Sequence, residues 1–279
     1  MHNISTLPGY LTKLALLALA LSLLACEKFE YSPYEVRLNE DEKNINHRNI
    51  EKIKALNVSP EEPLQFILTA DSQSFYEENE KLVNHVNQNY PDAHFLLLGG
   101  DITDFGLLKE FRLVNNDLKR LNMPYVAVVG NHDAINNGKE VYRAMFGDFD
   151  LSFVVGNSKF ILLNTNYLEF DKKVPNLDWL EAELKDGKNY DHVFVLSHIP
   201  PSSNEFGKEK SAIYGQLLSQ YNASFSLHGH THAFKYYYPF DGRVPYLISG
   251  PTERLEYTVF TVVGDKISFE QVSVNGLNQ

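Results

Sequence analysis

The chain has 279 residues, of which 43% are hydrophobic and 13% aromatic, so it can bury a large core and one sizeable globular domain is expected. This composition excludes disorder of the whole chain. The formal net charge of −11 gives a surface that repels nucleic acid, so no nucleic-acid partner is expected.

The amino-terminal region carries an apolar run. Residues 14–25, LALLALALSLLA, are uncharged and follow Lys13 directly. The run is shorter than the roughly 20 apolar residues that span a bilayer, so it predicts a signal peptide over residues 1–25. Cys26, the single cysteine of the chain, comes next after Leu-Leu-Ala, and this sequence resembles a bacterial lipobox. The resemblance implies lipidation of Cys26 and a lipid anchor on the periplasmic or outer face of a bacterial envelope; an ordinary cleaved signal and a retained hydrophobic tail are the alternatives.

A polar and charged segment separates this region from the rest of the chain. Residues 26–62 contain one helical pattern near residues 41–56 and end at Pro60 and Pro63. We interpret them as a lipidated tether and amino-terminal extension. Residues 63–279 then form the predicted globular domain.

From Leu64 the chain alternates between apolar runs of strand length and stretches of helical periodicity. The apolar runs are QFILTA, HFLLLGG, YVAVVGN, KFILLNT and HVFVLSH. Continuous apolar strands that alternate with helices indicate parallel strands buried on both faces. After His232 only strand-like runs follow, and they predict a second, more antiparallel sheet. The pattern therefore predicts an α/β domain with two sheets packed between helices.

Polar residues appear where the predicted strands end. Asp71, Asp101 and Asn131 follow the first three strands at intervals of thirty residues, about the length of one βαβ unit. His198 follows a later strand, and His230 comes after the run SFSLHG. Because ligands bind at the carboxyl ends of strands in open α/β sheets, we expect these side chains to converge.

Five motifs in order resemble the calcineurin-like metallophosphoesterase family. The chain has Asp-Ser-Gln at 71–73, Gly-Asp-Ile-Thr-Asp at 100–104, Gly-Asn-His-Asp at 130–133, Ser-His at 197–198 and Gly-His-Thr-His at 229–232. One such motif is weak evidence, since turns often carry these residue types, but the complete ordered set is specific. The resemblance covers about residues 64–264. It implies a four-layer αββα sandwich of two mixed β-sheets flanked by helices, and hydrolysis of phosphomonoesters or phosphodiesters.

The resemblance also implies a pair of metal ions bridged by Asp101. One ion would be held by Asp71, Gln73, Asp101 and His232. The other would be held by Asp101, Asn131, His198 and His230. Carboxylate, amide and imidazole ligands suit Mn, Fe, Zn or Co, and such a pair can generate a bridging hydroxide that attacks phosphorus in line with the leaving oxygen.

His132 resembles the catalytic histidine of the family, and Asp104 resembles the aspartate that orients it. An imidazole held in this way can protonate the leaving oxygen. No arginine follows Asp104, where the serine/threonine protein phosphatases have one to clamp phosphate, so protein phosphatase activity is disfavoured. The motifs look more like those of the cyclic-nucleotide and nonspecific phosphodiesterase branch of the family, and a small phosphoester is the expected substrate.

Gln73 departs from the family pattern, which usually has histidine at this position. Its amide oxygen can coordinate an ion, but it is a neutral and weaker ligand. The alternative function is therefore a noncatalytic lipoprotein that binds a ligand or partner with a degenerate metal site. The sequence does not predict the oligomeric state.

Overall fold

The computed structural model describes residues 13–17, 32, 34–186 and 190–276 and divides the chain into two compact units, Met1–Glu35 and Val36–Gln279. In the first unit residues 13–17 are helical and exposed, while the predicted cleavage and lipidation site at Cys26 lies outside the described residues. Within the described ranges, no helix combines the length and the apolar character that crossing a membrane requires. The domain boundaries at 25/26 and 62/63 stay predictions.

The second unit contains two mixed β-sheets. The first sheet has the order β11-β10-β1-β2-β3. Its parallel strands are β1 (Leu64–Thr69), β2 (Phe95–Leu98) and β3 (Tyr125–Ala127). Two antiparallel strands, β10 (Glu256–Val263) and β11 (Lys266–Ser273), extend it on the other side of β1.

The second sheet has the order β4-β5-β6-β7-β9-β8. Four of its strands are parallel to their neighbours, and one antiparallel strand closes each edge. The strands are β4 (Leu151–Val155), β5 (Ser158–Leu162), β6 (His192–Leu196), β7 (Phe225–His228), β8 (Lys235–Tyr237) and β9 (Tyr246–Ile248).

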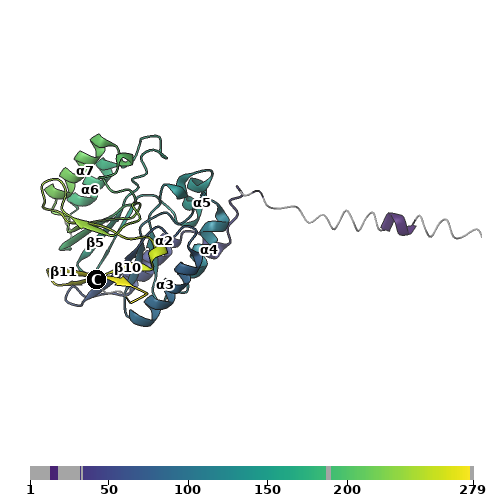
Figure 1. Cartoon of the computed structure of the whole chain (residues 1–279), viewed down its shortest axis with the longest axis horizontal. Helices are drawn as coiled ribbons and strands as arrows, with labels where there is room; N and C mark the ends of the chain where they lie inside the picture. Colours follow the sequence, from purple (N-terminus) through teal and green to yellow (C-terminus); the bar gives the residue numbers. More distant parts are fainter. Residues whose placement is uncertain (1–12, 18–31, 33, 187–189, 277–279) are drawn as a thin grey trace, which may run out of the picture. The chain divides into compact units, whose positions relative to one another are not determined.

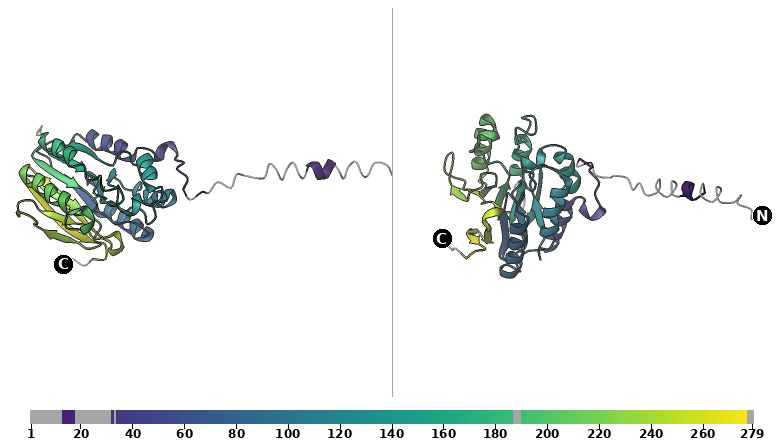
Figure 2. Two further views of the ribbon diagram at one scale, coloured as in Figure 1. Left: turned by 90° about the horizontal axis from the view of Figure 1, so that it is seen from above. Right: turned by 45° about the vertical axis from the view of Figure 1, so that its right-hand side comes forward.

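Helices cover the outer face of each sheet, so the unit has four layers (Figures 1 and 2). The first sheet packs against α3 (Tyr76–Asn89), α4 (Leu108–Leu118) and α5 (Gly138–Met145). The second sheet packs against α6 (Leu177–Lys185) and α7 (Lys208–Gln220). This arrangement confirms the predicted αββα sandwich.

The alternation of side chains along each strand explains the layers. In β1, Ile67 packs toward the helices, whereas Phe66 and Leu68 pack into the core between the sheets. Phe66 stacks on Phe260 of its own sheet at 4.8 Å and meets the edge of Phe160 from the other sheet at 5.1 Å. Both faces of these strands are buried, and for this reason they are apolar without interruption.

The carboxyl-terminal strands do not form a separate sheet, and this part of the sequence-based prediction is wrong. Strands β8 and β9 join the second sheet, whereas β10 and β11 join the first, where β10 pairs with β1. The stacking of Phe260 on Phe66 favours this pairing because it buries both rings between the sheets. Strand β4, which the sequence analysis missed, forms a hairpin with β5 through Gly156 at φ 55°.

Helix α2 (Ile45–Ala55), within the predicted extension, covers the free edge of β3. The Asn46 amide donates to the carbonyl oxygen of Ala127 at 2.8 Å and accepts from its N–H at 2.9 Å. Asn49 donates to the carbonyl oxygen of Tyr125 at 2.8 Å. These side chains satisfy backbone groups that an edge strand would otherwise leave open.

Candidate metal centre

The predicted ligands lie on sharp turns that follow the strands. Four of them adopt φ in the left-handed region, which non-glycine residues rarely occupy outside constrained sites. Their φ values are 54° at Asp71, 51° at Asp101, 74° at His230 and 52° at His232. The turns let the chain reverse immediately after a strand and leave the side chains at the carboxyl edge of the sheets.

Close backbone packing holds the two aspartate turns together. The Asp71 N–H donates to the Gly100 carbonyl oxygen at 3.0 Å, and the N–H groups of Ser72 and Gln73 both donate to the Asp101 carbonyl oxygen, at 2.9 and 3.0 Å. Gly130 lies against the same turn, since a Cβ there would stand 2.1 Å from the Asp101 nitrogen. The positions of Asp71 and Asp101 are therefore fixed by the main chain.

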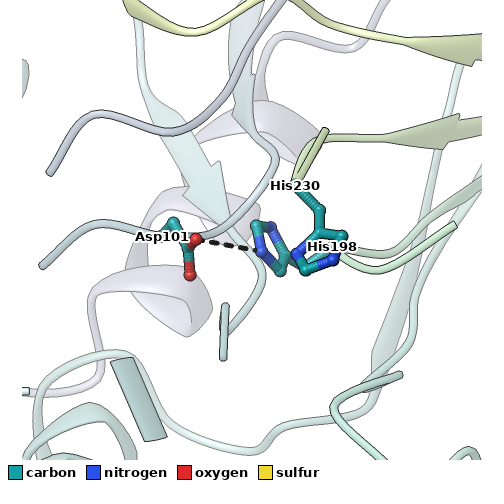
Figure 3. A group of neighbouring side chains, drawn as sticks. All are labelled: Asp101, His198 and His230. Carbon is teal, nitrogen blue, oxygen red and sulfur yellow. Dashed lines mark ion pairs between the residues drawn. The ribbon is translucent and has the colours of Figure 1, made fainter. Parts of the chain in front are cut away.

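Two groups of side chains converge so that each could hold a metal ion. Asp101, His198 and His230 form one group, and Asp71, Asp101 and His232 form the other. In each group the potential ligand atoms lie within 4.8 Å of one another, and Asp101 belongs to both. Figure 3 shows the His198 ring directed toward the Asp101 carboxylate, with the His230 ring beside it. These two groups contain five of the seven predicted ligands, and Asn131 is the sixth that lies with them.

Asn131 joins the first group through its amide oxygen. This Oδ1 atom lies 3.0 Å from His198 Nε2 and 3.1 Å from His230 Nδ1. His198 Nδ1 donates to the Gly99 carbonyl oxygen at 2.7 Å, which leaves Nε2 as the atom that faces Asp101 Oδ2 at 3.2 Å. A hydrogen bond of this kind fixes the tautomer in which Nε2 can bind a metal.

The pKa shifts at the site show that the Asp71 and Asp101 carboxylates need a positive charge beside them. Burial raises the pKa of the Asp71 carboxyl to about 7, although His198 opposes this increase. Burial also acts to raise the pKa of Asp101, but His198 outweighs it and holds this pKa below its ordinary value. Burial lowers the pKa of His198, yet Asp101 more than reverses the effect and brings it to about 9. The His198 proton supplies the balancing charge here, and a divalent cation can replace it.

Gln73 is the seventh predicted ligand, and its environment fits a cation. The side chain is buried, and its Oε1 atom has no hydrogen-bond partner among the described residues. Its Nε2 lies 3.5 Å from Asp101 Oδ2. A buried acceptor oxygen without a donor is costly, and a metal ion would satisfy it.

His132 and Asp104 interact, but not through the aspartate carboxylate. His132 Nδ1 donates to the main-chain carbonyl oxygen of Asp104 at 3.0 Å, and the His132 N–H donates to Asp101 Oδ1 at 3.0 Å. The Asp104 carboxylate instead accepts a hydrogen bond from the Ser74 hydroxyl. Burial lowers the pKa of His132, but the Asp101 carboxylate and the Asp104 carbonyl produce a net increase. His132 is thus oriented with Nε2 available to carry a proton.

Two neighbours support the site without facing it. Asp133 accepts hydrogen bonds from the N–H groups of Gly130, Ile102 and Thr103, at 2.8, 3.1 and 2.8 Å, and so ties two loops together. His228 is buried with Ser197 at Nδ1 and Ser226 at Nε2, which occupies both ring nitrogens.

Two acidic residues near the site were missed by the sequence analysis. Glu205 Oε2 lies 3.5 Å from His230 Nε2. Burial raises the pKa of Glu169, with smaller contributions from Glu205 and Asp101, and its Oε2 has no hydrogen-bond partner among the described residues. Glu205 lies in a short 3-10 helix (Asn204–Phe206) and Glu169 in a turn, and neither segment has a recognisable pattern, so no sequence signal could have identified these residues.

Comparison with known proteins relates this geometry to a family. The family model described as calcineurin-like phosphoesterase matches residues 64–234. The human serine/threonine-protein phosphatase CPPED1 is 32% identical over 139 residues, which cover 43% of this chain and 44% of the relative. The 3',5'-cyclic-nucleotide phosphodiesterase alr5338 of Nostoc sp. is 27% identical over 151 residues, covering 51% of this chain and 57% of the relative. The chain therefore spans about half the length of the curated relatives it matches.

A solved structure shares the fold at low sequence identity. Purple acid phosphatase PPD1 from yellow lupin (Lupinus luteus) seeds superposes with a TM-score of 0.64 at 11% identity, over 78% of this chain and 53% of that one. At this identity the likeness concerns the fold alone. It agrees with the two mixed sheets flanked by helices.

Proposed function

The chain belongs to the calcineurin-like phosphoesterase family, and from this premise we propose that it uses two divalent ions to hydrolyse a small phosphomonoester or phosphodiester. The observation that carries the proposal is the convergence of two ligand groups on one shared carboxylate, Asp101. Asp101 is buried between Asp71 and His198, where the His198 proton balances its charge and a divalent cation can take the place of that proton.

The proposed ligands are those that the family motifs indicate. One ion is held by Asp71, Gln73, Asp101 and His232. The other is held by Asp101, Asn131, His198 and His230. The orphaned Gln73 oxygen and the mixed oxygen and nitrogen donors fit Mn, Fe, Zn or Co. Once bound, the ions supply Lewis acidity toward the phosphoryl oxygens and lower the pKa of water in the site.

The side chains around the ions have separate tasks. His198 is held by the Gly99 carbonyl oxygen, so its Nε2 lone pair stays aimed at the site. His132, held at Nδ1 by the Asp104 carbonyl oxygen, keeps Nε2 free to pass a proton to the leaving oxygen as the P–O bond breaks. The upward shift of the His132 pKa favours the protonated form that this step needs.

A small substrate is favoured over a phosphoprotein. Phe105 follows Asp104 and is 57% exposed, so no guanidinium is available at this place to clamp phosphate from two sides. The named activities of the relatives include both a protein phosphatase and a cyclic-nucleotide phosphodiesterase, so assays must cover monoesters and diesters.

We further propose that the enzyme acts on the extracytoplasmic side of a bacterial envelope, anchored through lipidated Cys26. The apolar run at residues 14–25 and the cysteine that follows it support this location. Cys26→Ser should move the protein out of the membrane fraction and abolish incorporation of radiolabelled fatty acid. Fatty-acid labelling that survives this substitution would contradict the anchor.

Two variants of the purified full-length chain test the catalytic proposal. Metal content is measured by mass spectrometry, and turnover with nitrophenyl phosphate and bis-nitrophenyl phosphate. His132→Ala should retain metal and lose about 10² to 10⁴ in kcat, whereas Asp101→Asn should lose metal itself. Equal metal loss in both variants would contradict the assigned roles. A metal-replete wild type that is inactive on mono- and diesters would favour the noncatalytic binding protein.

A further inference from the structure

A polar cavity lies apart from the metal centre, between α2, α4 and the beginning of β3. Its volume is about 340 Å³, and none of the predicted metal ligands lines it. Tyr125, at the amino end of β3, forms part of its wall, whereas the metal ligands follow the carboxyl ends of strands. We call it the α2–α4 cavity.

The α2–α4 cavity is basic on a chain that is acidic as a whole. Arg48 and Lys52 of α2 and Lys119 after α4 line it, with Asp41 as the one acidic residue in the lining. The formal net charge of the chain is −11. Three cations around one cavity therefore stand out from the general charge distribution.

These three cations form no ion pair with any carboxylate in the part of the chain that the structure describes. Arg48 Nη2 donates to the main-chain carbonyl oxygen of Asp41, and Lys52 Nζ donates to Asn49 Oδ1 at 3.1 Å. By contrast, Lys54 of the same helix is paired with Glu51 at 3.0 Å. Lys119 lowers the pKa of Glu42 by longer-range attraction, but no carboxylate lies within ion-pair distance of the three cations among the described residues, and Arg48 and Lys52 each donate one of several N–H groups, so donors remain for an anion from solution.

The floor of the cavity is ordered by buried amides. Asn49 is 8% exposed and donates to the Tyr125 carbonyl oxygen, while the Tyr125 hydroxyl donates to Asn115 Oδ1 at 2.6 Å. Asn115, whose oxygen is engaged in this way, also lines the cavity. Ile45 and Leu118 add apolar surface to the lining. A preorganised floor with donors, apolar surface and a cationic rim is typical of a small-molecule site.

We infer that the α2–α4 cavity binds a small organic anion that carries a phosphate group, of the size of glycerol phosphate. Guanidinium, ammonium and amide groups are the usual donors to phosphate oxygens, and the lining charge of three cations against one carboxylate matches a dianion. A cavity of about 340 Å³ exceeds the needs of bare phosphate and leaves space for the organic part.

The same chemistry has two sources. One is a soluble organophosphate, and the other is the headgroup of an anionic phospholipid. The phospholipid source depends on the proposed function, because it requires the proposed lipid anchor at Cys26. The amino-terminal unit that contains Cys26 ends at Glu35, and Asp41 of the cavity follows only a few residues later in the sequence.

Hydrogen-exchange mass spectrometry of the full-length chain distinguishes these sources. The protein in neutral detergent receives sn-glycerol 1-phosphate, or it is reconstituted in phosphatidylcholine vesicles with or without phosphatidylglycerol. Peptides covering residues 41–55 and 115–125 report on the cavity, and those covering 99–104 report separately on the metal centre. Slower exchange in the cavity peptides with glycerol phosphate assigns the soluble source, and slower exchange only with phosphatidylglycerol assigns the headgroup.

Paired lysine substitutions on one helix provide the control. Lys52→Gln, at the exposed rim of the cavity, should lower the affinity for the ligand, as reported by the protection of the cavity peptides, at least about tenfold, because one charged hydrogen bond is lost. Lys54→Gln removes the same charge outside the cavity and should leave the protection unchanged. The inference is overturned if neither ligand slows exchange in the cavity peptides, or if both substitutions weaken the protection equally.

Discussion

Replacing Gly130 with alanine tests whether the metal centre depends on the close contact between two turns. A Cβ at this position would lie 2.1 Å from both the nitrogen and Oδ1 of Asp101. Ordinary contact begins near 3.4 Å, so Asp101 must move by about 1.3 Å or the loop must open by the same amount. The φ of Gly130 is not positive, so the alanine backbone itself is tolerated and the contact alone causes the effect.

A shift of this size at the shared ligand should affect both proposed metal positions. Displacements of about 1 Å in a catalytic arrangement can cost roughly 10²-fold in rate, so we expect kcat/KM to fall by about that factor and bound metal to decrease. Metal content and kcat/KM for both nitrophenyl esters are measured together with the melting temperature. These readouts separate loss of the site from loss of the fold.

Gly242→Ala is the matched control. Its φ is 74°, and an added Cβ would meet no atom within 4 Å, so this substitution causes only backbone strain. We expect a modest decrease in melting temperature of this variant with unchanged metal content. A Gly130→Ala protein with wild-type metal content and wild-type kcat/KM would refute the reasoning.

Three further predictions follow from single side chains. Gln73→Leu removes the orphaned acceptor oxygen, so metal analysis should find one ion per chain in the variant, against the two ions proposed for the wild type; an unchanged metal content would show that Gln73 is not a ligand. Because burial raises the pKa of Asp150 to about 6, ionisation of this carboxyl opposes folding, and wild-type stability should decrease between pH 4 and pH 7. Asp150→Asn keeps an oxygen that accepts the hydrogen bond from the Asn164 N–H but cannot ionise. In urea denaturation its free energy of unfolding should exceed that of the wild type by about 1 to 2 kcal/mol at pH 7 and equal it at pH 4. An equal difference at both pH values would contradict this assignment. Metal affinity measured by calorimetry should increase with pH from 7 to 9, because a bound ion must displace the proton that Asp101 holds on His198, and a pH-independent affinity would refute this linkage.

The local pattern of the sequence was sufficient to predict two sheets between helices and polar residues that gather at the ends of the strands, whereas the roles of these residues as metal ligands came from the resemblance to the family motifs. Apolar runs of strand length are apolar throughout because both faces of the central strands are buried, so Phe66 and Ile67 pack into different cores without any gap in the pattern. The thirty-residue spacing of Asp71, Asp101 and Asn131 follows from one strand and one helix per unit, and parallel strands bring their carboxyl ends to one edge.

The pairing of the last strands was predicted incorrectly because local sequence does not contain it. Strands β8 to β11 all follow turns and have similar strand-like sequence patterns, yet β8 and β9 join the second sheet while β10 and β11 join the first. The choice depends on the partner that is available, and β10 finds the open side of β1 about 190 residues earlier in the chain. Pairing over such a distance is decided by the burial of side chains from both partners.

The detailed chemistry of the site also depends on contacts between distant segments. The nitrogen of His198 that faces the site is selected by the carbonyl oxygen of Gly99, 99 residues away in sequence. His132 is held by the main-chain carbonyl oxygen of Asp104, whereas the family resemblance implied only that this aspartate orients it. Glu205 lies close to His230, and α2 covers the edge of β3, but no sequence motif predicts either contact. The sequence by itself determined which residue types follow each strand, because periodicity and turn chemistry act over a few residues. Tertiary structure decided which atoms face one another, because that depends on how separate segments pack.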